Sequence, residues 1–488
     1  VCKVEHFIVA GREMNIYLGI ASLAATEFGI VTCMYTAQAG YTRGFAGAIP
    51  GICMALAMFV VGWTGFCVKP LRDSGVMTIP ELFEKRYGGF VRWLAGVVIV
   101  LGGLLNMGVF LRVGGQFLVV CCGMNPTYLE IAMTVLLIGV AVYTILGGML
   151  SVLVTDYLQF IVMSAGLLVV TVLILGKVGW DNILLTVHQH FGAGGFNPFQ
   201  NPKLGWQFVL SNLITNTAAV LTWQTCIARL LSAKDTRTGR KVYTGTAFFF
   251  VCRWMIPGIW GIAALASVTV SPDTLSSIAA TMGEKDSSLF AMPLYLSTIV
   301  PMGMMGILIA AMLAADMSTD ASYMITWGSV IYNDILAPFR RRRPWSEKKG
   351  ILINRFIIAL IGLFLLFWGL WYKLEGNLWE YLQTTGTIYL SSMSILLIAC
   401  CYWKRANNWG AIAAIVMGAG LPILALSLNL FVEVEFFDAA GQLQKQGWTA
   451  YHIGDNWVNI GTYAIVAISM IAGSLLKPLF RPSPNPTL

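Results

Sequence analysis

Apolar residues fill about twelve stretches of the chain, each long enough to cross a lipid bilayer as a helix. A transmembrane helix needs roughly 20 apolar residues, and short polar segments separate these stretches. The predicted spans cover residues 14–39, 46–68, 93–120, 128–147, 151–176, 206–228, 244–270, 301–326, 353–372, 378–402, 408–432 and 457–476. The pattern therefore predicts an all-α membrane protein with a single transmembrane domain over residues 1–488.

Basic residues gather on alternate connections between these spans. One set of connections, with both chain ends and the adjoining first turn of the ninth span, holds 23 of the 31 Lys and Arg. The other set holds six, and two lie deep inside spans. By the positive-inside rule, both ends of the chain are cytoplasmic in a multi-pass protein of the cell membrane. The run Arg340–Arg343 follows the eighth span. We interpret it as a topology anchor rather than a nucleic-acid or lipid site.

The composition supports a membrane protein and excludes several other classes. The chain is 57% apolar and 11% charged, whereas a soluble domain has about 45–50% and about 25%. The ten cysteines contain no C-x-x-C pair and fall mostly in apolar runs, so we expect buried thiols without metal. No nucleotide-binding or hydrolase motif is present. The sequence therefore predicts no enzyme and no nucleic-acid partner, and uphill work would draw on an ion gradient, light or a partner.

Six ionisable residues lie deep inside the predicted spans, away from the span ends. Because charge is costly in a bilayer, each one is a candidate functional residue, and the alternative for each is an internal ion pair. They are Glu27, Arg112, Asp156, Arg253, Asp316 and Asp320.

Hydroxyl groups follow one face of the eighth span. Ala315, Ser318, Thr319 and Ser322 are spaced i, i+3, i+4 and i+7, which places a carbonyl and three hydroxyls together. Neutral oxygens suit a weakly held monovalent cation such as sodium. The alternative is that these hydroxyls bond to carbonyls one turn back. In the first span, small residues, a glutamate and a glycine over 22–29 predict a broken helix with free carbonyls. The alternative is a glycine that only serves helix packing.

Several segments, in this order, resemble the sodium/solute symporter family, which includes sodium-coupled sugar, proline, sialic acid and monocarboxylate carriers. The matching segments are 7–12, 78–87, 147–148, 155–159, 228–235, 310–322 and 402–405. The resemblance implies a LeuT-like core of inverted five-helix repeats, 14–176 and 206–402, with two peripheral helices over 408–476. The solute is then expected between broken spans one and six. The family usually has one more helix before the first span, and the sequence leaves open whether one precedes Val1.

The resemblance also assigns sodium ligands by position. The main site falls on three carbonyls and two hydroxyls, those of Ala25, Phe28, Ala315, Ser318 and Thr319. A second sodium site of some members corresponds to Asp156 and Ser322. Ala321 replaces a hydroxyl there, which argues against a tightly held second ion.

The solute is expected to carry a carboxylate. Arg112 lies at about the position where the sialic acid carriers place a carboxylate-binding arginine, and a guanidinium matches a carboxylate bidentately. A sugar or polyol is the alternative. The other residues assigned to the solute are Thr32, Glu27, Asn216, Trp223, Gln224, Arg253 and Gln383.

Taken together, these features predict a sodium-coupled symporter that imports a small organic solute by alternating access. The alternatives on the same fold are a passive channel or facilitator and a solute-binding receptor. Asp316 and Asp320 lie one turn apart and repel each other. The sequence leaves open whether they bind a proton, an extra cation or Arg112.

Overall fold

The computed structural model describes residues 4–202, 204–340, 342–374, 376–437 and 443–480. Lys3, Lys203, Arg341 and Arg481, which entered the charge count, lie outside these ranges. The first half of the chain forms α1 (Val4–Val9), α2 (Ile16–Thr26), α3 (Ile30–Arg43), α4 (Ile49–Thr64), α5 (Val68–Asp73), α6 (Ile79–Tyr87), α7 (Gly89–Met107), α8 (Phe110–Cys121), α9 (Leu129–Val178), α10 (Trp180–Phe191) and α11 (Gly205–Thr222). The second half forms α12 (Gln224–Ser232), α13 (Thr236–Leu265), α14 (Pro272–Met282), α15 (Ala291–Ile299), α16 (Met302–Val330), α17 (Glu347–Trp371), α18 (Leu378–Tyr402), α19 (Asn408–Phe431), β1 (Glu433–Phe437), β2 (Leu443–Gly447), α20 (Trp448–His452) and α21 (Asp455–Phe480).

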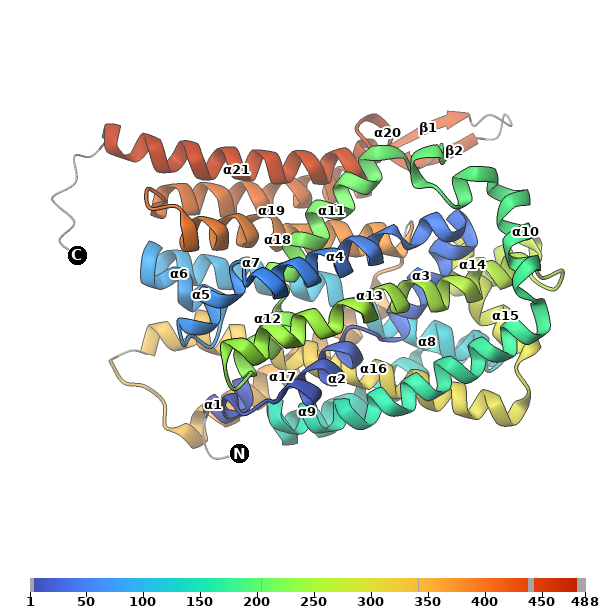
Figure 1. Cartoon of the computed structure of the whole chain (residues 1–488), viewed down its shortest axis with the longest axis horizontal. Helices are drawn as coiled ribbons and strands as arrows, with labels where there is room; N and C mark the ends of the chain where they lie inside the picture. Colours follow the sequence, from blue (N-terminus) through green and yellow to red (C-terminus); the bar gives the residue numbers. More distant parts are fainter. Residues whose placement is uncertain (1–3, 203, 341, 375, 438–442, 481–488) are drawn as a thin grey trace.

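The long helices run side by side as one bundle (Figure 1). Among the described residues, ten segments are long and apolar enough to cross a membrane. The predicted first and sixth spans are not among them as whole spans. The first is divided, so that α3 joins the second span while α2 is short, and amides and hydroxyls interrupt α11 in the sixth. The described ends of the chain, α1 and the last turns of α21, lie at the same end of the bundle (Figure 1). α19 and α21 pack against each other and on α18 along one edge.

Two of the predicted spans are broken in their middle. The first divides into α2 and α3 around Glu27, Phe28 and Gly29, where Gly29 has extended backbone. A Cβ at Gly29 would lie 2.8 Å from the Thr319 hydroxyl, so only glycine allows this close approach of α3 to α16. The sixth divides into α11 and α12 at Trp223, which is also extended. The break predicted over residues 22–29 is thus present.

A sharp turn at Gly148 separates the fourth and fifth predicted spans within α9. Gly148 has a φ of 70°, in the left-handed region that favours glycine. The third predicted span is also interrupted, between α7 and α8 at Gly108 and Val109. That interruption was not predicted.

A small antiparallel hairpin, β1 and β2, is the only sheet among the described residues. It lies in the connection between α19 and α21, away from the helical core. Apart from this hairpin, the described chain has the predicted all-α architecture.

Candidate functional site

A cavity lies where the two broken helices meet. Its wall includes the α2–α3 break and Trp223 at the α11–α12 break. The remaining lining comes from α3, α4, α7, α8, α11, α13, α16 and α18. Breaks place unpaired backbone groups and helix ends at this depth, where they can face a cavity instead of lipid.

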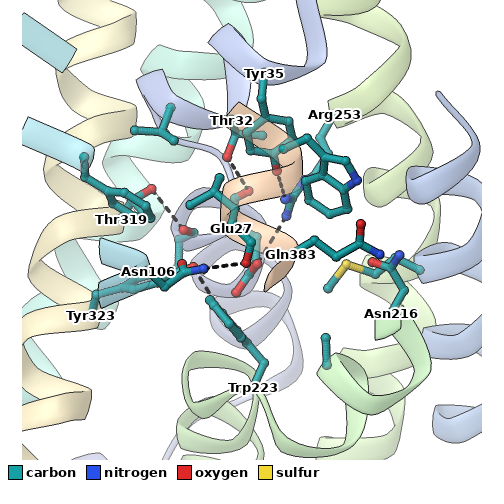
Figure 2. Close-up of a pocket in the computed structure, with 18 of the residues that line it drawn as sticks. Glu27, Thr32, Tyr35, Asn106, Asn216, Trp223, Arg253, Thr319, Tyr323 and Gln383 are labelled. Carbon is teal, nitrogen blue, oxygen red and sulfur yellow. Dashed lines mark hydrogen bonds and ion pairs between the residues drawn. The ribbon is translucent and has the colours of Figure 1, made fainter. Parts of the chain in front are cut away.

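A charged pair forms one side of the cavity. Arg253 Nη1 donates to Glu27 Oε2 at 3.2 Å, and its Nη2 donates to the Tyr35 hydroxyl. The other oxygen of Glu27 accepts a hydrogen bond from Thr225 at 2.5 Å. Figure 2 shows Arg253 between Tyr35 and Glu27. The single guanidinium that lines the cavity is therefore already neutralised by a carboxylate of the protein.

Amides and aromatic rings supply most of the remaining recognition surface. Asn216 and Gln383 line the cavity opposite Thr319 (Figure 2). Trp223 Nε1 donates to the Tyr323 hydroxyl at 3.1 Å, which fixes two rings of the wall. These groups offer hydrogen bonds and flat apolar faces, as small-molecule sites commonly do.

Next to this cavity lie the predicted sodium ligands. Thr319 lines the cavity, and its hydroxyl donates to the carbonyl of Thr26 at 2.9 Å and to that of Ala315 at 3.1 Å. Ala25, Phe28, Ala315 and Ser318 are buried close to this contact between α2 and α16. The donors are neutral oxygens, which fit sodium. The Ser318 hydroxyl donates to Asp156 at 2.5 Å instead of pointing to these carbonyls.

A guanidinium occupies the position between Asp156 and Ser322. Arg229, fully buried at 0% exposure, donates from Nη2 to Asp156 Oδ2 at 3.0 Å and to the Ser322 hydroxyl at 2.5 Å. Ser22 and Thr26 complete the network around it. The sequence had placed Arg229 in a cytoplasmic connection. The structure therefore brings the two predicted ligands together around an internal cation, not around an open site.

Arg112 is not part of the cavity wall. Its Nε donates to Glu284 at 2.6 Å, and its two terminal nitrogens donate to the carbonyls of Met282 and Gly369 at 2.8 and 3.2 Å. An internal acid thus compensates this charge. The expected contact between Arg112 and a solute carboxylate is not supported by this geometry, and Arg112 does not pair with Asp316 or Asp320.

Most other residues assigned to the solute do line the cavity. Thr32, Glu27, Asn216, Trp223, Arg253 and Gln383 are all in its wall. Gln224 instead lines a separate, smaller cavity beside Thr326 and Ser329. It lies one residue beyond the break, and the helical turn of α12 directs it away.

Sequence reasoning missed several wall residues. Asn106, Tyr35 and Tyr323 line the cavity but were not assigned, and Asp316 was noted without a role. Asn106 Nδ2 donates to the Leu382 carbonyl at 2.7 Å, which ties α7 to α18. A polar amide in an apolar span was the available signal, the same signal that pointed to Asn216 and Gln383.

Comparison with known proteins agrees with this geometry. The family model described as "Sodium:solute symporter family" matches residues 7–418. The chain belongs to the sodium:solute symporter family. Similar curated proteins include sodium/glucose cotransporter 4 of Danio rerio, 27% identical over 85% of this chain and 66% of the relative. Sodium/mannose cotransporter SLC5A10 of Bos taurus is 25% identical over 86% and 74%, and the sodium/myo-inositol cotransporter of Mus musculus is 25% identical over 87% and 63%. The chain thus spans about two thirds of the length of these relatives.

Solved structures show the same fold. A sodium-coupled sialic acid symporter in a substrate-bound outward-open state has a TM-score of 0.75 at 19% identity, over 100% of this chain and 94% of that one. Mhp1, a nucleobase-cation-symport-1 family transporter, has a TM-score of 0.52 at 12% identity, over 98% and 95%. The predicted LeuT-like fold of this symporter family member is confirmed.

Proposed function

We propose that this symporter family member couples sodium entry to the import of a small polar solute by alternating access. The observation that carries the proposal is the position of Thr319. Its side chain belongs both to the wall of the cavity and to the contact between α16 and the end of α2. The same arrangement of helices would therefore be stabilised by a cation at that contact and by a solute in the cavity. This shared stabilisation is the physical basis of coupling between cation binding and solute binding.

A neutral polyhydroxy solute, such as a sugar or polyol, fits the cavity best. Its guanidinium is held by Glu27, while amides, hydroxyls and aromatic rings form the rest of the polar and flat surface. The similarity to glucose, mannose and myo-inositol carriers supports the same class. We infer that Arg112 has a structural role, because Glu284 balances it away from the cavity.

A carboxylate-bearing solute is the second candidate. One observation favours it: Arg253 Nε is buried and has no hydrogen-bond partner among the described residues. A solute carboxylate could bind that nitrogen if Glu27 moved or became neutral.

We also place both chain ends in the cytoplasm, from the distribution of basic residues. In this orientation α3 and the first turns of α11 and α18 form the extracellular half, so the cavity extends from mid-membrane toward the outside. Within the chain we assign residues 14–176 and 206–402 to the two inverted repeats, and 408–476 to the peripheral helices.

Uptake into proteoliposomes tests the proposal. Vesicles prepared without sodium would be given labelled glucose, mannose, myo-inositol, lactate, proline or sialic acid, with either sodium or choline outside. The proposal expects uphill uptake of a sugar or polyol that stops with choline. Uptake of carboxylates alone would favour the second candidate. Flux that ignores sodium would indicate a facilitator, and binding without flux would indicate a receptor.

A further inference from the structure

The position between Asp156 and Ser322 already holds a positive charge. Arg229 contacts both residues and is enclosed by Ser22 and Thr26. A sodium ion could enter only by displacing a fully buried guanidinium, which would leave that charge without its partner. A second transported cation must therefore have another binding site in this chain.

Two carboxylates on α16 lack any compensating charge in the described part of the chain. Asp316 is 1% exposed and Asp320 is 2% exposed. Asp316 Oδ2 and Asp320 Oδ1 have no hydrogen-bond partner there. The nearby buried arginines are paired with other acids. A buried carboxylate is stable only when a cation pairs with it or a proton neutralises it, and here that cation or proton must come from outside the chain.

The surroundings of Asp316 leave one oxygen available. Its Oδ1 accepts a hydrogen bond from the amide of Ile30 at 3.3 Å, at the first residue of α3. This helix end stabilises one negative charge and directs the other oxygen away from α3. Gly114 lies beside that oxygen, where even a Cβ would approach to 3.3 Å. Asp316 also lines the cavity, so an ion in the cavity can reach it.

Asp320 lies one turn further along the same face, at the spacing where side chains are neighbours, with Cβ atoms about 5–6 Å apart. Unlike Asp316, Asp320 has no helix end to balance its charge. A single monovalent cation between the two carboxylates would offset one of their two negative charges and contact both orphaned oxygens, while the helix end at Ile30 stays beside the other charge. Hard cations such as sodium prefer oxygen ligands of this kind.

We propose that Asp316 and Asp320 form a second sodium site. It lies on α16 beside the neutral-oxygen site at Ala315 and Thr319, and it differs from that site by its formal negative charge. The inference rests on the proposed function, since it gives the symporter two coupling ions per cycle. Two ions would allow a steeper solute gradient than one ion at the same membrane potential.

Sodium binding to the purified full chain tests the site without any solute. Radioactive sodium would be titrated in detergent, with Asp320→Asn and Asp316→Asn as test variants. Asp273→Asn is the matched control, because Asp273 is an exposed aspartate on α14. We expect about two ions per chain in the wild type and the control, and about one in each test variant. When both are measured without sodium, each test variant should be at least as heat-stable as the wild type, because the substitution removes an uncompensated buried charge.

Three results would overturn the proposal. The first is a wild type that binds one ion, and the second is a pair of variants that still bind two. The third is a result in which the two variants bind sodium as the wild type does but lose uptake driven by a proton gradient. That result would make Asp316 and Asp320 a proton site. A wild type that binds two ions but shows no sodium-driven uptake would refute the proposed function and leave the second site standing.

Discussion

Replacing Arg112 with methionine should destabilise the protein without changing which solute it carries. Methionine keeps much of the chain length but removes the charge and all donors. Glu284 then loses the guanidinium at 2.6 Å, and the carbonyls of Met282 and Gly369 lose their donors. The amide of Gln116 still donates to Glu284 at 2.7 Å.

The expected cost follows from the burial of the pair. The side chains of Arg112 and Glu284 are 7% and 2% exposed, and removing one member of such a pair costs about 3–5 kcal/mol. The remaining bond from Gln116 and one from the Leu374 amide at 2.9 Å place the cost toward the lower figure. The double variant Arg112→Met/Glu284→Gln removes both charges. Its free energy of unfolding should lie only about 1–2 kcal/mol below that of the wild type, and this remaining loss is the cost of the unpaired polar groups.

Two measurements on the same preparations separate a structural role from solute binding. The half-life of the folded protein in detergent at a fixed temperature should fall by up to about a hundredfold in Arg112→Met, if the pair breaks before the transition state of unfolding. It should largely recover in the double variant. The solute concentration for half-maximal uptake should stay close to that of the wild type in both. A stable single variant that loses only carboxylate uptake would refute this reasoning and return Arg112 to the solute.

Substitutions of a hydroxyl, a helix cap and an amide give three further expected outcomes. Ser318→Ala and Thr319→Ala should each raise the sodium concentration for half-maximal uptake about tenfold, because a methyl group has no lone pair for the ion; unchanged sodium dependence in both would remove these hydroxyls from the site. Asp235→Ala should lower the free energy of unfolding by about 1 kcal/mol at pH 7, since Asp235 caps α13 by accepting from the Thr238 amide at 2.6 Å. That bond lowers the pKa of Asp235. The stability that the cap contributes is therefore present above the unfolded pKa of about 3.9 and is lost as pH falls through the lower folded pKa. A stability difference between wild type and Asp235→Ala that persisted unchanged in strong acid, measured by chemical denaturation, would contradict the cap. Gln383→Ala should raise the solute concentration for half-maximal uptake about five- to tenfold, the loss of one hydrogen bond, while sodium binding measured without solute stays the same.

Local patterns were enough to predict the helices and one of the breaks. Apolar runs of membrane length depend only on neighbouring residues, and the described helices follow most of the predicted spans. The break around Glu27 and Gly29 was visible because a charged residue and a glycine interrupt an apolar run. The grouping of hydroxyls on one face of α16 followed from helical spacing in the same way.

Contacts between distant segments could not be predicted from those patterns. The predicted sixth span ended at residue 228, one position before Arg229, yet α12 continues to Ser232 and carries that guanidinium into the core. Glu284 lies in a connection after α14, which folds back onto α8 to reach Arg112. In both cases a residue that looked like part of a surface loop is buried by helices far away in the sequence. Only the packed bundle shows which charges meet.

The pairing of these charges explains which ions and solutes the interior can accept. Three arginines in the core, Arg112, Arg229 and Arg253, each contact a carboxylate of the protein at 2.6–3.2 Å. An anionic solute would have to displace such a carboxylate before it could use a guanidinium. The acids on α16 have no such partner among the described residues, so when ionised they leave negative charge at this depth. Negative charge attracts cations and repels anions, which joins the two proposals: sodium bound at α16 offsets part of this charge, and an uncharged solute binds beside it without breaking an ion pair.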